Sequence, residues 1–196
     1  MPTVAIFGTL DTKGTEFRFL RDRLRALGVE TLVVDCGALE APAFPPDVAA
    51  EEVAEAAGTS LAALRARRDR GEAVAAMARG AARIAARLFA EGRLQGIVSL
   101  GGSAGTTIGT AAMRALPVGV PKVMVSTLAS GDTRPYVDTK DLCMLHSVVD
   151  VAGINRLSRR ILGNAAAAIA GLLFFGLSAL AAEPGPAVKA GRTLPE

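Results

Sequence analysis

The chain has 196 residues, of which 51% are hydrophobic but only 4% aromatic, and it contains no tryptophan. This length is typical of a single domain, and such an aliphatic core is typical of helices packed on a parallel sheet. The 22 basic and 19 acidic side chains leave a net charge of +3, a balance that argues against nucleic acid as a partner.

The first predicted strand, residues 4–7, is followed directly by the glycine-rich sequence GTLDTKGT at residues 8–15. Glycines let backbone N–H groups approach a phosphate, the helix that follows presents its positive end, and Lys13 adds a point charge. The spacing matches neither the P-loop nor the dinucleotide motif GxGxxG. A structural alternative stays open here, in which Asp11 or Thr12 caps the helix.

A second strand is predicted at residues 31–34, after an arginine-rich amphipathic helix. Asp35 ends this strand, at a position where a carboxylate accepts ribose hydroxyls or merely terminates the strand. Residues 36–46 are rich in Pro, Ala and Gly and predict an exposed loop. Helix-forming residues at 49–58 and 61–91 then predict a helical passage that can carry the chain across the sheet.

The third predicted strand, residues 96–100, leads into GGSAGTT at residues 101–107 and a helix that runs to about residue 116. Small residues before a helix again expose N–H donors to an anion, unless they only allow the helix to pack closely on the sheet. If the helical passage brings the first and third strands together, both glycine-rich motifs line one crevice at the carboxyl ends of the strands. Convergent donors of this kind favour a phosphate site.

A fourth strand at residues 122–126 is followed by the polar loop STLASGDT, which ends at residue 133. Asp132 in this loop, and Asp11 in the first motif, are candidate oxygen ligands for Mg²⁺. Thr9, Ser103 and Thr106 are neutral partners for the same ion. The alternative is that Asp132 belongs to a solvated Asp–Thr turn.

A fifth strand is predicted at residues 142–145 and a final helix at residues 150–182. The single histidine, His146, is interpreted as a hydrogen-bonded core residue, and Asp150 and Asn155 as helix caps. The uncharged stretch inside the final helix is long enough to span a bilayer, but its glycines and alanines favour a helix buried on the sheet or in a dimer interface. We therefore expect no membrane partner.

The basic residues at 65–70 are interrupted by Asp69 and are interpreted as a solvated helix face. The two cysteines, Cys36 and Cys143, have no metal-ligand spacing, and residues 1–14 read as a strand and its loop instead of a signal peptide. These features favour a cytoplasmic location.

The segment 183–196 is rich in Pro and Gly and predicts a linker toward a second domain that this chain lacks.

Four motifs in one order, GTLDTKG, GGSAGT, STLASGDT and SVVDVAGINRLSRRILGNAAAAIAG, carry a family resemblance. The chain resembles the ATP-binding domain family of the tomato mosaic virus resistance protein and its uncharacterised bacterial relatives. This resemblance implies a Rossmann-like nucleotide-binding domain over residues 1–182, ATP with Mg²⁺, homodimers and a second α/β domain downstream. The second motif of the family usually reads GGSGGT, so Ala104 tests whether that position needs a positive φ.

Together, residues and resemblance predict an α/β fold: a Rossmann-like, doubly wound, mainly parallel sheet of about five strands with helices on both faces. We expect the nucleotide contacts in the three loops and at the end of the second strand. The expected residues are Gly8, Thr9, Asp11, Thr12, Lys13, Asp35, Gly101, Gly102, Ser103, Gly105, Thr106, Ser130, Gly131, Asp132 and Thr133.

Whether the nucleotide is turned over stays open at this point, because no catalytic base stands out in the sequence. A regulatory or structural interaction module without turnover is one alternative. An NAD-type oxidoreductase domain is a second alternative, and the missing GxGxxG motif disfavours it.

Overall fold

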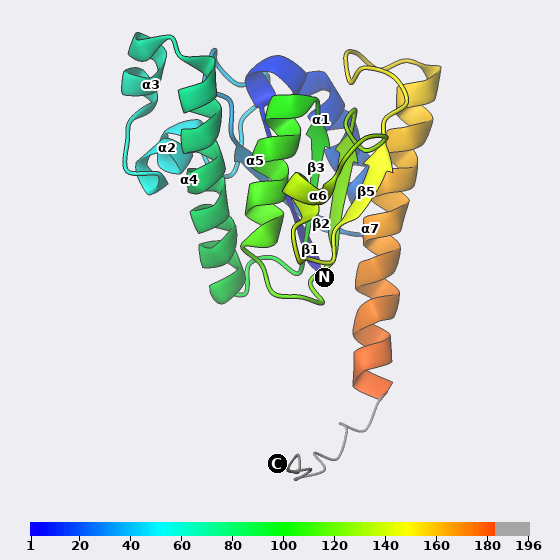
Figure 1. Ribbon diagram of the computed structural model, residues 1–196. Coiled ribbons are helices and arrows are strands. Elements are labelled where there is room, and N and C mark those ends of the chain that lie inside the picture. The colour runs from blue at the N-terminus through cyan, green and yellow to red at the C-terminus, as the bar shows by residue number, and fades with distance from the viewer. Residues whose placement is uncertain (183–196) are drawn as a thin grey trace, which may run out of the picture.

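The computed structural model describes residues 1–182, with side chains up to residue 176, and shows one five-stranded sheet (Figure 1). All four strand pairings are parallel, and the strand order is β2-β1-β3-β4-β5. The predicted α/β fold class is therefore confirmed. The strands are β1 (Thr3–Gly8), β2 (Glu30–Asp35), β3 (Gly96–Gly101), β4 (Lys122–Ser126) and β5 (Cys143–His146).

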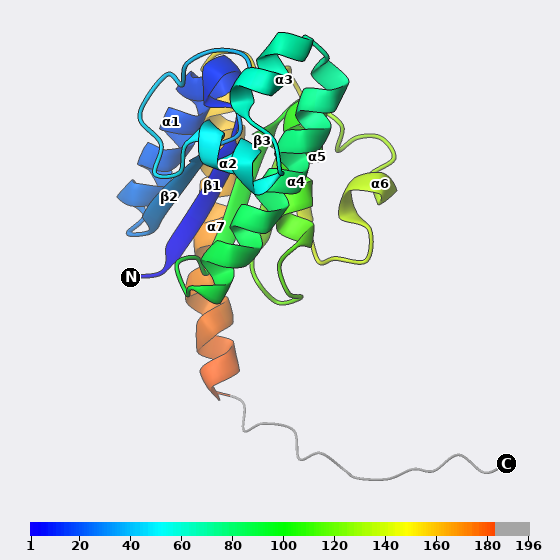
Figure 2. The same ribbon diagram turned by 90° about the vertical axis from the view of Figure 1, so that its left-hand side faces the viewer.

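Helices cover both faces of this sheet (Figure 2). Those of one face are α1 (Leu10–Ala26) and α7 (Arg156–Ala182). Those on the other side are α2 (Ala50–Ala56), α3 (Leu61–Arg67), α4 (Arg70–Ala90) and α5 (Ser103–Arg114). A short helix, α6 (Arg134–Val137), lies in the connection between β4 and β5.

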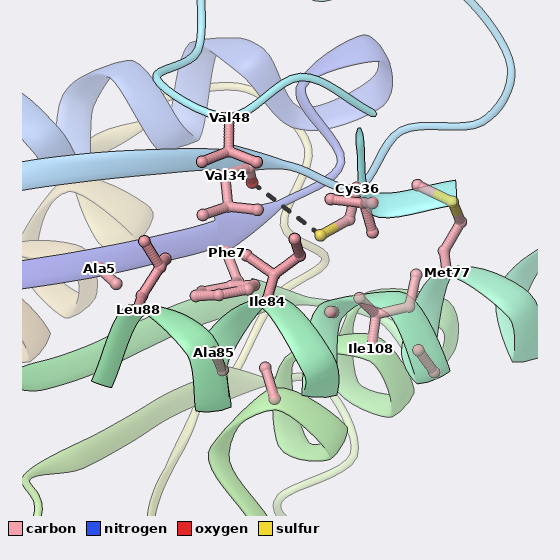
Figure 3. Packing of buried hydrophobic residues seen from close by; sticks show 14 of the residues in the cluster. Ala5, Phe7, Val34, Cys36, Val48, Met77, Ile84, Ala85, Leu88 and Ile108 are labelled. Atoms are coloured by element: carbon pink, nitrogen blue, oxygen red, sulfur yellow. Dashed lines mark hydrogen bonds between the residues drawn. The ribbon is translucent and has the colours of Figure 1, made fainter. Parts of the chain in front are cut away.

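The side chains of β1 alternate between the two faces of the sheet, so this strand packs against both helix layers. Val4 and Ile6 are buried in the cluster formed with α1 and α7, whereas Ala5 and Phe7 are buried in the cluster formed with α4 and α5. Successive side chains of a strand point to opposite faces, so a continuous apolar run is what a sheet covered on both faces requires. Figure 3 shows Phe7 packed against Ile84 of α4.

The strand order reverses at β1, and this reversal positions the candidate site. The chain leaves β1 through α1 to reach β2, and it then returns past β1 through α2, α3 and α4 to reach β3. Strands β1 and β3 are therefore hydrogen-bonded neighbours, with Ile6 opposite Val98. Ligands of open parallel sheets bind at such a reversal, outside the carboxyl ends of the strands.

Two helix boundaries differ from the sequence prediction. The helix predicted over 61–91 is two helices, because Arg68 adopts a left-handed conformation with φ 54° and Asp69 accepts a hydrogen bond from the N–H of Glu72 to begin α4. The final helix begins six residues later than predicted. Its first turn is capped by Asn155, whose Oδ1 accepts the N–H groups of Leu157 and Ser158.

The prediction that His146 is a core residue is wrong, because its side chain is exposed on β5. Strand β5 forms the edge of the sheet and pairs only with β4 within the described residues. Its neighbour Cys143 is exposed as well. The segment after residue 182, predicted to be a linker, lies outside the described residues.

Helix α7 packs on α1, β3 and β4 through a stripe that includes Leu162, Ile169 and Leu173. Over Arg156–Gly176 it has the length and hydropathy of a membrane span, with 39% of the most apolar window buried in the protein. The buried stripe is what we expect of a helix that covers a sheet. The opposite side of α7 presents Leu172 and Phe175 at the surface.

Candidate functional site

A cavity of about 500 Å³ lies at the carboxyl ends of β1 and β3, where the strand order reverses. Both glycine-rich segments line it. The first contributes Thr9, Asp11, Thr12 and Lys13, and the second contributes every residue from 101 to 105. The sequence prediction that these two segments share one crevice therefore agrees with the geometry of the structure.

The segment after β3 is a tight turn into α5. A Cβ added to Gly101 would lie 2.9 Å from the Cα of Gly105, and one added to Gly105 would lie 3.0 Å from the carbonyl oxygen of Leu100, so both positions of this turn favour glycine. The first hydrogen bond of α5 runs from the N–H of Thr106 to the carbonyl of Gly102 at 2.8 Å. The N–H groups of residues 103–105 precede this bond and have no partner among the described residues. They form the positive end of α5 at the wall of the cavity.

Ala104 shows how this chain tolerates a departure from the family motif. It lies inside α5, and the described residues with positive φ other than glycine are Arg68, Asp138 and Val148. The position therefore does not need a positive φ, and alanine fits it without strain.

The segment after β1 enters α1 through a distorted first turn. The carbonyl of Thr9 accepts the N–H groups of Thr12 and Lys13, and the hydroxyl groups of Thr9 and Thr12 are 2.9 Å apart. Lys13 itself has non-helical angles, φ −129° and ψ 24°, which mark a kink. Its ammonium group forms no ion pair or hydrogen bond with the described residues. An unpaired cation on the cavity wall is available to an anion.

Asp11 does not cap α1, contrary to one of the sequence interpretations. Its Oδ2 accepts the N–H of Leu39 at 2.9 Å and that of Glu40 at 3.4 Å, so the carboxylate holds the segment that follows β2. Gly37 lies so close that an added Cβ would be 2.6 Å from the Asp11 Cγ. The Oδ1 atom is buried and has no partner among the described residues.

Asp35 is a structural residue in this fold. Its side chain does not line the cavity, and the residue is only 1% exposed. The Oδ1 atom accepts the N–H of Leu10 at 3.1 Å and the N–H of Gly37 at 2.8 Å. Burial raises the pKa of this carboxyl group to about 6. Asp35 therefore joins the two segments that follow β1 and β2, and because it does not line the cavity, its position does not favour the predicted contact with a ribose.

The third loop does not reach the cavity. None of the residues from 130 to 133 lines it, and Asp132 instead forms an exposed ion pair with Arg134 at 2.8 Å. Hydrogen bonds from Arg134 lower the pKa of Asp132. The structure thus supports the solvated-turn interpretation of this segment and leaves Asp11 as the candidate metal ligand of the two.

Two further predicted residues support the site from beneath. The hydroxyl group of Thr106 is buried and lies 2.7 Å from that of Ser126, which ties α5 to the end of β4. Gly8 gives room to the Phe17 ring, because an added Cβ would lie 2.0 Å from its Cζ. Both residues shape the floor of the site without lining the cavity.

Sequence reasoning missed one wall of the cavity, which comes from α4 and from the segment after β2. The residues of this wall are Cys36, Ala38, Leu39, Arg70, Ala73, Val74 and Met77. The sequence places Arg70 on a solvated helix face, but its spacing of three, four and seven residues from the other α4 residues indicates that it shares their stripe of the helix. Asp150 also lines the cavity and is not a helix cap.

Comparison with known proteins identifies similar sequences of unassigned activity. Residues 2–175 match the model of the Uncharacterised protein family (UPF0261) N-terminal domain. A UPF0261 protein of Clostridium tetani is 52% identical over 170 residues, which cover 87% of this chain and 42% of that protein. A UPF0261 protein of Mesorhizobium japonicum is 48% identical over 174 residues and is covered to the same 42%.

A plant protein is similar at lower identity. The ToMV resistance protein Tm-1 of Solanum lycopersicum is 35% identical over 192 residues, which cover 88% of this chain and 25% of that protein. The chain therefore spans less than half the length of the relatives that it matches. This span agrees with the expectation of a further domain in the longer proteins.

Proposed function

The chain belongs to the UPF0261 family through its N-terminal domain, and we propose that its cavity binds ATP by the phosphate groups. One observation carries this proposal. Two glycine-rich segments that are far apart in the sequence line the same cavity, and they bring to it unpaired N–H groups and an unpaired lysine. Anion sites are built from these groups, and a helix N-terminus strengthens them.

The donor set suits phosphate better than a carboxylate of a metabolite. Residues 103–105 offer consecutive N–H groups at the start of α5, and Gly102 leaves open space, since an added Cβ would meet its nearest atom at 3.7 Å. A phosphate can therefore approach the backbone closely, and Lys13 can neutralise part of its charge. The hydroxyl groups of Thr9 and Ser103 add neutral donors at the same wall.

Mg²⁺ fits this proposal through Asp11. Proteins hold Mg²⁺ with one or two carboxylates, and phosphate oxygens and water complete the octahedron. Asp11 lines the cavity, and its buried Oδ1 has no partner among the described residues. The described residues contain no cluster of three or more His, Cys, Asp or Glu side chains that could hold an ion without such help.

The lining of the cavity favours a domain that, by itself, binds the nucleotide without hydrolysing it. His146 is exposed on the edge strand and does not line the cavity, so it is not placed to act as a base there. Cys36 does line the cavity, but burial raises the pKa of its thiol, which keeps the group protonated and a weak nucleophile. Turnover, homodimer formation and a cytoplasmic location remain predictions for the longer protein.

The variant Gly102→Ala tests the proposal. The added methyl group has room in the folded protein, but it occupies the space in which a phosphate approaches the helix N-terminus. We expect at least about a tenfold loss of affinity for ATP with Mg²⁺ by calorimetric titration, because one or two charge-assisted hydrogen bonds are lost.

Gly163→Ala is the matched control, because Gly163 lies in α7 away from the cavity and an added Cβ would meet nothing within 4 Å. This variant should bind ATP as the unchanged protein does. Equal affinities of the Gly102→Ala variant and the unchanged protein would contradict the proposal.

A further inference from the structure

One face of α4 forms a wall of the cavity. Arg70, Ala73, Val74 and Met77 line the cavity and are spaced by three, four and seven residues, so they lie on a single stripe of the helix. Met77 is fully buried, whereas Val74 is partly exposed and Arg70 is exposed. The stripe therefore runs from an apolar floor to a cation at the mouth of the cavity.

The facing wall is apolar as well. Leu39 is 63% exposed although it lines the cavity, and its N–H is held by Asp11. A large apolar side chain held in this position stays exposed to water unless a ligand covers it. Together with Val74 and Met77 it outlines an apolar half of the cavity, next to the polar half formed by the glycine-rich segments.

The backbone of this apolar half has few hydrogen-bonding groups left to offer. The carbonyl groups of Ala38 and Glu40 accept hydrogen bonds from the Arg65 guanidinium at 3.0 and 3.1 Å, and the N–H groups of Leu39 and Glu40 are directed to Asp11. The α4 backbone is engaged from its second turn on, since the N–H of Glu72 bonds to the Asp69 side chain and that of Ala73 to the Asp69 carbonyl. A base that enters this half thus meets Leu39 and the Cys36 thiol on one wall and Val74 and Met77 on the other, with Arg70 at the mouth.

From this arrangement we propose that the apolar half receives the base of a purine nucleoside triphosphate by contact alone and does not distinguish adenine from guanine. This inference rests on the proposed phosphate site. Discrimination between bases requires hydrogen bonds that the wrong base leaves unpaired, and shape alone separates rings of equal size poorly. The base adds affinity through buried apolar area, and inorganic tripolyphosphate lacks that part.

Calorimetric titration of the full chain with ATP, GTP and inorganic tripolyphosphate, each with Mg²⁺, tests this inference. We expect ATP and GTP to differ by less than about threefold in affinity, and both to bind at least about tenfold more tightly than tripolyphosphate. Val74→Trp should fill the apolar half and remove this advantage, while tripolyphosphate binds as before. Val118→Trp is the matched control, since Val118 is 70% exposed in the loop before β4, away from the cavity.

A second variant keeps the test valid if Val74→Trp does not fold. Leu39→Ser shortens an exposed side chain, so it should weaken ATP and GTP equally and leave tripolyphosphate unchanged. A preference of about tenfold or more for either purine, or tripolyphosphate binding as tight as ATP, would overturn the inference and leave the phosphate site intact. Failure of all three compounds to bind would overturn both proposals.

Discussion

The carboxyl group of Asp35 is buried, and it joins two backbone segments by accepting the N–H groups of Leu10 and Gly37. Its pKa is raised from 3.8 to about 6, chiefly because burial disfavours the charged form, and the hydrogen bonds from Gly37 and Leu10 offset only part of this effect. The folded protein therefore binds a proton more tightly than the unfolded chain does. The stability that this proton provides is fully present below pH 3.8 and is lost as the pH rises through about 6.

We predict that Asp35→Asn removes this pH dependence. The amide keeps an oxygen that can accept the N–H groups of Leu10 and Gly37, and it carries no charge to bury. Urea denaturation should show the variant to be more stable than the unchanged protein by about 1 to 3 kcal/mol at pH 7, with the difference shrinking toward pH 4. A difference between the two proteins that is the same at both pH values would contradict this assignment.

Val148 is a strained residue in the segment between β5 and α7. It is β-branched, has φ 64° and is 61% exposed, and the N–H of Val149 bonds to the carbonyl of Ser147 across it at 2.7 Å. Three-residue turns with a positive φ at the centre are rare and strained. The same segment carries Asp150 to the cavity wall.

Replacing this valine with glycine should relieve the strain. We predict that Val148→Gly raises the free energy of unfolding by up to about 1 kcal/mol, which corresponds to an increase of about 2 to 4 °C in Tm. Val149→Gly is the comparison, because Val149 is not among the residues with positive φ and should lose stability. A lower Tm for Val148→Gly would show that the turn is not strained.

At the scale of elements, the contact between α2 and α4 holds the wall of the cavity in place. The helices cross at Gly80, where an added Cβ would lie 2.0 Å from the backbone carbonyl oxygen of Val53. Backbone cannot move aside as a flexible side chain can. A methyl group at this crossing must push the two helices apart.

We predict that Gly80→Ala lowers the free energy of unfolding by about 1 to 3 kcal/mol, despite the better helix propensity of alanine. Thermal unfolding followed by circular dichroism measures this loss. Gly163→Ala, in the open part of α7, should instead gain up to about 1 kcal/mol. If both variants gained stability, the close approach at Gly80 would not limit the packing of α4.

For the whole molecule, the sequence was sufficient to predict the fold and the cavity that both glycine-rich segments line. The apolar runs predicted five strands, and the helical passage after Asp35 is long enough to make β1 and β3 neighbours, as the structure shows them to be. These features are local in sequence or follow from the handedness of crossovers. The lining of one cavity by both glycine-rich segments is a direct result of them.

The partners of individual side chains could not be predicted in this way. Asp11 binds the N–H of Leu39, and Asp35 binds that of Leu10, because the segments after β1 and β2 lie side by side in the fold. Nothing in the spacing of these residues shows that contact. Asp132 of the third loop forms an ion pair with Arg134, two residues away. The sequence spacing allows this local ion pair, but it does not decide between the ion pair and a metal contact.

The reversal of strand order at β1 also determines when the cavity can exist. The two glycine-rich segments that line it belong to distant parts of the chain, and they meet only when the α2–α4 passage lies on the sheet. An early fragment of the chain therefore has half of the donors and no enclosure. Under the proposed function, an anion bound there would hold the two segments together, and it would stabilise the folded protein in proportion to its concentration.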